Sequence, residues 1–132
     1  NVRAIALDWS NAKQCIRALD DGTRQLLLSA DTVVGSDVIY GLDACEALLD
    51  LLQLLPVRRA LFVGERRIVF VAGSGSQAPA VDDFRALIAA RRHVWTLDEL
   101  EAPRHLTNVV MHDVNESVSM DDVFVFRLSR VA

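Results

Sequence analysis

The sequence predicts an α/β fold, a single domain over residues 1–132 with a mixed sheet of about six strands, two main helices and a short third. The central observation is residues 67–98, where an apolar run, a glycine-serine turn, an amphipathic segment and a second apolar run follow one another. This order is typical of a strand–loop–helix–strand unit, whose two strands are parallel. We therefore expect a parallel β-loop-α-β unit at residues 61–98, with antiparallel segments at 2–30 and 108–128.

Composition narrows the functional classes. Hydrophobic residues make up 52% and charged residues 24% of the chain, as in an ordinary soluble domain. Its apolar runs all fall short of the roughly 20 residues that span a bilayer, and a net charge of −4 argues against nucleic-acid or membrane binding. Cys15 and Cys45 stand in no metal or redox spacing and suit a reducing cytoplasm. We expect a cytoplasmic protein without a cofactor.

The N-terminal segment, residues 2–30, is predicted to form β-strands. Residues 2–9 are predicted to form the first strand, and the runs 14–19 and 24–30 flank an Asp-Asp-Gly-Thr sequence. Asp-Gly between two apolar runs favours a β-hairpin, since glycine accepts the positive φ of the turn. The competing interpretation is a helix over residues 11–19 that is capped by Ser10.

A helix follows a stretch with two extended pieces, 32–34 and 38–40. Asp43 fits an N-cap with Glu46 three residues later, as in a capping box, and Pro56 predicts the end of the helix near Leu55. Most of its apolar residues share one face. Leu51 and Leu54 fall nearer the polar side, which predicts that another element or a second subunit covers the helix there.

The second half alternates strands and one helix. Residues 61–63 and 68–72 form either a hairpin or one long bulged strand. Helical spacing then joins Val81, Phe84, Leu87 and Ile88, and Pro79 suits the first turn of that helix. We predict a short helical turn at 98–101 and two final strands at 108–114 and 123–128, joined by a polar loop.

A glycine-rich loop carries the first candidate site. Gly73, Ser74, Gly75 and Ser76, with the residues that follow, fit G-x-G-x-x-A, and Asp98 closes the next predicted strand. This resembles the dinucleotide-binding fingerprint of Rossmann proteins, which implies that the loop holds a phosphate and Asp98 the ribose hydroxyls. The alternative is a solvent loop before a helix whose own Asp82 and Asp83 complement its positive end and repel phosphate.

The opening of the chain carries the second candidate site. Residues 4–11, with Asp8 at the end of the predicted strand, resemble the start of the ribonuclease H-like superfamily. That resemblance implies a metal ligand at Asp8, with Glu46 and Glu65 as further carboxylates for Mg²⁺. Trp9 departs from the ATPase branch, which has a glycine there.

The sequence contains no motif for metal binding by histidine or for nucleophilic catalysis by cysteine. The three histidines, His93, His105 and His112, match no metal-binding pattern, so we assign no metal site, and the two cysteines are expected to be inert core thiols. The leading hypothesis is therefore a small accessory or protein-interaction domain without catalytic activity, with a protein partner or self-association. The alternative is a phosphate-handling enzyme or nucleotide binder. Nucleic-acid binding without catalysis would need the arginine pairs 58–59, 66–67 and 91–92 on one face.

Overall fold

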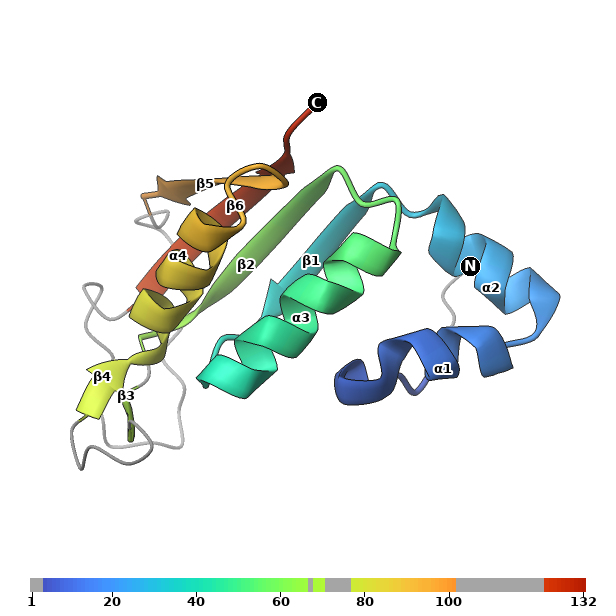
Figure 1. The fold of residues 1–132 in the computed structure, drawn as a ribbon, viewed down its shortest axis with the longest axis horizontal. Coiled ribbons are helices and arrows are strands. Elements are labelled where there is room, and N and C mark those ends of the chain that lie inside the picture. Colours follow the sequence, from blue (N-terminus) through green and yellow to red (C-terminus); the bar gives the residue numbers. More distant parts are fainter. Residues whose placement is uncertain (1–3, 67, 71–76, 102–122) are drawn as a thin grey trace, which may run out of the picture.

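The structure is a computed structural model that describes residues 4–66, 68–70, 77–101 and 123–132, and it is a mixed α/β fold (Figure 1). The strands of the main sheet lie in the order β1-β2-β6-β5 and comprise β1 (Thr32–Ser36), β2 (Arg59–Glu65), β6 (Val123–Arg130) and β5 (Trp95–Leu100). Strands β1 and β2 are parallel, and β6 is antiparallel to both of its neighbours. Within the described residues this sheet has four strands, so the predicted sheet of about six is not confirmed.

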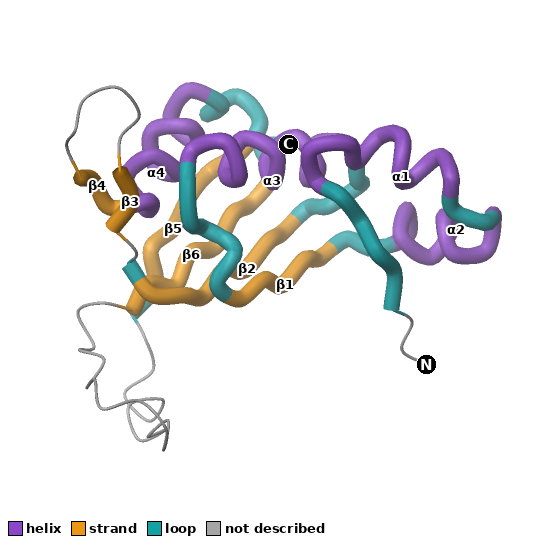
Figure 2. The backbone as a smooth tube through the Cα atoms, turned by 90° about the horizontal axis from the view of Figure 1, so that it is seen from below, coloured by secondary structure: helices purple, strands orange, loops and turns teal. Residues whose placement is uncertain are grey.

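Helices α3 (Leu42–Leu54) and α4 (Ala80–Ala90) cover one face of this sheet (Figure 2). Between them and the strands lies an aromatic core, in which the Phe84 ring is 5.9 Å from both Phe62 and Phe126. Burial of such rings is the largest stabilising contribution in a small domain. Among the described residues, no helix is both long and apolar enough to cross a bilayer.

Helix α3 confirms the prediction made for this segment, with one change. It ends at Leu54, two residues before Pro56, but its N-cap is Gly41, so Asp43 lies in the first turn instead of capping it. Leu51 is only 7% exposed, because the N-terminal elements pack on that side of α3, whereas Leu54 remains 43% exposed. Another part of the same chain therefore covers the second apolar side of the helix.

The predicted N-terminal strands are wrong. Residues 4–8 have no regular structure, and a 3₁₀ turn η1 (Trp9–Asn11) leads into helices α1 (Ala12–Ala18) and α2 (Asp21–Ser29). The Asp-Asp-Gly-Thr sequence begins a helix: the Asp20 carboxylate accepts a hydrogen bond of 2.9 Å from the Thr23 N–H, as an N-cap does. The Arg24 side chain binds the Leu19 carbonyl at 2.6 Å and so satisfies the preceding helix end.

The proposed pairing of residues 68–72 with the strand around Trp95 is also wrong. Strand β3 (Ile68–Phe70) pairs antiparallel with β4 (Gln77–Pro79) in a separate two-stranded sheet, so neither the hairpin with 61–63 nor the long bulged strand is present. The two strands that run in the same direction are instead β2 and β5, and β6 lies between them, antiparallel to both. The helix predicted between them is present as α4, with Val81, Phe84 and Ile88 buried.

The predictions for the C-terminal part of the chain have different outcomes. Residues 98–101 do not form a helical turn, because β5 continues to Leu100 and pairs with β6 along its whole length. Strand β6 confirms the predicted strand at 123–128 and extends it to Arg130. The strand predicted at 108–114 and the loop at 115–122 lie outside the described residues.

Candidate functional site

A groove separates η1 from helix α3. It consists of two adjoining hollows of about 460 and 400 Å³, whose walls share Trp9, Ser10, Asp43 and Ala47. The small alanine side chain at 47 leaves the α3 side of the groove open, and the Trp9 indole forms the opposite wall. A groove of this volume could hold a small molecule, and its lining is a mixture of polar and apolar side chains.

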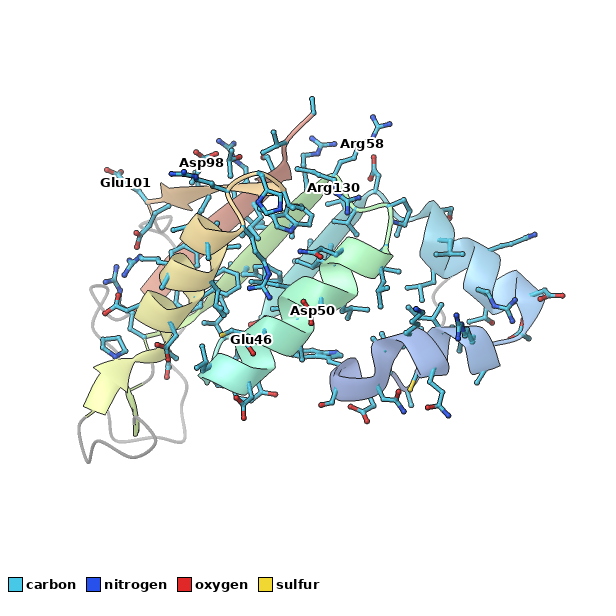
Figure 3. The ribbon with its side chains drawn as sticks, viewed as in Figure 1. Glu46, Asp50, Arg58, Asp98, Glu101 and Arg130 are labelled. Carbon is cyan, nitrogen blue, oxygen red and sulfur yellow. The ribbon has the colours of Figure 1, made fainter. Side chains whose placement is uncertain are left out.

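The charged residues of the lining are mostly acidic. Asp8, Asp43, Glu46 and Asp50 line one or other hollow, and Lys13 is the basic residue among the lining side chains. Glu46 and Asp50 lie along the same helix, α3 (Figure 3). Carboxylates accept hydrogen bonds from hydroxyl and amino groups and repel phosphates, so the lining favours a ligand that donates hydrogen bonds.

The groove lies next to the carboxyl end of a parallel strand. The turn from β1 to α3 passes through Asp37, which has a φ of 59° and is the one non-glycine residue with positive φ in the described part of the chain. Its backbone N–H donates to the Val63 carbonyl at 2.8 Å, which ties this turn to β2. Tyr40, in the same turn, is 48% exposed and lines the 400 Å³ hollow. Unusual backbone conformations and ligand sites both concentrate at such strand ends.

Of the residues of the Rossmann-like hypothesis, the structure describes only Asp98, and Asp98 and Asp8 lie on different elements. Gly73, Ser74, Gly75 and Ser76 lie outside the described residues, between two strands that pair with each other. Asp98 lies on β5, the edge strand farthest from β1, and its carboxylate binds the Arg127 guanidinium at 2.8 Å. Asp8 lies beside α3, where its side chain accepts a hydrogen bond of 3.0 Å from the Ser10 N–H.

The carboxylates of the ribonuclease H-like hypothesis lie on three separate elements. Asp8 precedes η1, Glu46 lies on α3 and Glu65 ends β2. Within the described part of the chain, no group of three or more His, Cys, Asp or Glu residues could hold a metal ion. Of the histidines, His93 follows α4, while residues 105 and 112 are outside the described ranges.

The buried thiol is chemically protected. Cys45 is fully buried on α3, and this burial raises the pKa of its thiol above the usual value. A raised pKa leaves little of the reactive thiolate at neutral pH, so the residue suits the core better than nucleophilic catalysis.

Sequence reasoning singled out Asp8 but missed Asp37 and Tyr40. The available signal was the pair Ser36 and Asp37, which follows the apolar strand at 32–34 shortly before a well-defined helix. In an α/β fold this position is where ligands bind. A scan against models of known protein families found no match, and a search of curated proteins found no matching sequence.

Proposed function

We propose that the chain binds a small molecule of the nucleoside class in the groove between η1 and α3. The observation that carries this proposal is the position of the groove at the carboxyl end of β1, next to the turn that holds Asp37 at positive φ. Parallel strands present their carboxyl ends to ligands in open α/β sheets. This is a form of the nucleotide-binding hypothesis that uses this groove instead of the glycine-rich loop.

The lining supports a nucleoside over a nucleotide. The Trp9 indole offers a flat surface on which a heterocyclic base can stack. The Asp8 carboxylate uses one oxygen for Ser10 and keeps the other for a ribose hydroxyl. Further carboxylates in the groove oppose the charge of a phosphate chain.

Titration with adenosine and with ATP, followed by thermal unfolding and calorimetry, tests this proposal. We expect millimolar adenosine to raise the melting temperature, and ATP to raise it less. The Asp8→Asn variant keeps an oxygen for the Ser10 N–H but loses the charge, and we expect it to weaken adenosine binding about tenfold.

Asp21→Asn is the matched control, because the Asp21 side chain is 90% exposed in the first turn of α2, outside the groove lining. It should bind adenosine as the native chain does. The proposal fails if adenosine does not shift the melting temperature, or if the two variants weaken binding equally.

A protein-interaction domain is the second candidate function. It is favoured by Tyr40, Leu42 and Leu54, which are 48%, 49% and 43% exposed on α3 and the turn before it. Apolar side chains of this kind mark a contact surface where they form a contiguous patch. Light scattering of the native chain and of a Leu54→Lys variant distinguishes the two: self-association that the variant abolishes supports this candidate, and a strict monomer for both argues against self-association through this surface.

A further inference from the structure

Two of the three arginine pairs of the sequence meet at one end of the main sheet. This group, called the basic edge below, comprises Arg58, Arg59, Arg91, Arg92 and Arg130. The backbone holds them together, since the Arg130 N–H donates to the Arg58 carbonyl at 2.9 Å and the Trp95 N–H donates to the Arg91 carbonyl at 3.1 Å. Figure 3 shows Arg58 and Arg130 at this same end.

Part of the basic edge has a structural role. The Arg130 guanidinium donates to the Leu55 carbonyl at 3.3 Å and lies over the Trp95 ring, and Arg91 approaches the Asp50 carboxylate at 3.4 Å. The Arg130 contacts join the end of α3 to the sheet, and the Arg91 contact joins the end of α4 to α3. They account for two of the five arginines.

The other three arginines have no structural use within the described part of the chain. Arg58, Arg59 and Arg92 are exposed, and no ion pair with a described residue involves them. By contrast, Arg66 at the opposite end of β2 is paired with Glu99 at 3.0 Å. Exposed guanidinium groups without partners are ready to bind carboxylates or phosphates in a bidentate manner.

We infer that the basic edge docks an acidic segment of a partner protein. The favoured partner is short because the chain as a whole carries a net charge of −4 and the acidic groove beside α3 adjoins the edge, where Asp50 both lines the groove and pairs with Arg91. A long RNA or DNA strand would extend past the edge onto these repelling surfaces, whereas a short acidic peptide can keep several carboxylates within the screening length of about 10 Å from the arginines. The inference is independent of the nucleoside proposal.

Fluorescence anisotropy with a labelled peptide of eight consecutive glutamates tests this docking surface in the full chain. We expect saturable binding that weakens as salt is added. The Arg58→Gln/Arg59→Gln variant should weaken it about tenfold. Arg92→Gln, in the turn after α4, provides a second variant should the double variant fold poorly.

The matched control for Arg92→Gln is Arg17→Gln, which removes the same charge from an exposed position of α1 outside the groove lining. We expect it to bind the peptide like the native chain. Equal losses in the edge and control variants would overturn the inference, because the effect would then be one of net charge. Tighter binding of a 20-nucleotide RNA, lost in the same edge variants, would also overturn it and assign the surface to nucleic acid.

Discussion

Helices α3 and α4 are held by burial, whereas helices α1 and α2 are held mainly by local polar contacts. The first two lie against the sheet and bury nine side chains between them. Helix α1 buries Ala12 and Ile16, and α2 buries none of its nine residues. Figure 1 shows α1 and α2 beyond β1. The difference indicates that stability is unevenly distributed among the four described helices, and that the two N-terminal helices are the less stable pair.

The candidate groove lies on the boundary between these two regions. Its wall on one side is η1, which leads directly into α1, and on the other side it is α3. A ligand in the groove would therefore contact both regions. Since binding to the folded state adds stability, we expect an occupied groove to slow local opening of the N-terminal helices more than that of the sheet.

The largest effect is expected for Phe84→Ala in the buried region. Phe84 is fully buried, and its ring contacts those of Phe62 and Phe126. Removal of the ring leaves a cavity and should lower the free energy of unfolding by about 3–5 kcal/mol. Urea unfolding measures this loss. Leu54→Ala, at an exposed position of α3, is the control, and a similar loss there would show that exposure does not separate the two sites.

A smaller effect is expected for Arg130→Met, which joins the end of α3 to the sheet. Its guanidinium donates to the Leu55 and Gln53 carbonyls and lies 5.3 Å from the centre of the Trp95 ring. Methionine keeps much of the apolar stem but loses both interactions, so we expect a loss of about 1–2 kcal/mol in urea unfolding. No loss would mean that burial alone fixes α3 on the sheet.

The N-terminal region is tested by Asp20→Ala. Loss of the cap on the Thr23 N–H should cost about 1 kcal/mol. Because α2 buries no side chain, this cost should appear as roughly fivefold faster hydrogen exchange within α2, with little change in α3. Asp20→Asn retains a capping oxygen and should exchange at the native rate. Equal acceleration in α2 and α3 would show instead that the two regions unfold together.

The same contrast explains what could be predicted from the sequence. Helices α3 and α4 can be predicted from the spacing of their apolar residues, because one face of each helix is buried. The Asp-Asp-Gly-Thr sequence suits both a hairpin turn and a helix start, and only the Thr23–Asp20 hydrogen bond decides between them. The strand that pairs with β3 could not be predicted from the sequence either, since an apolar run of this length can pair with any neighbouring strand.

The candidate site was predictable only in part. Asp8 stands out because it follows an apolar run, yet the sequence placed it on a strand, where the structure has an irregular segment beside α3. Asp37 and Tyr40 become notable only once β1 is known to be parallel to β2, because that pairing brings the turn to the carboxyl edge. The position of these two residues at a candidate site therefore follows from the order of the strands in the sheet, which long-range packing determines.

The smallest effect is expected for Glu46→Gln on α3. The sequence suggested a capping box in which Glu46 reaches back to Asp43, but the structure places the N-cap at Gly41 without a side-chain cap. Glu46 is exposed in the groove lining, so the variant should change the free energy of unfolding by less than about 0.5 kcal/mol. A loss near 1 kcal/mol in urea unfolding would restore the capping box and move the start of α3 to Asp43. If stability is unchanged while adenosine binding weakens, Glu46 contributes to the groove and not to the helix, because the two measurements then separate ligand contact from folding.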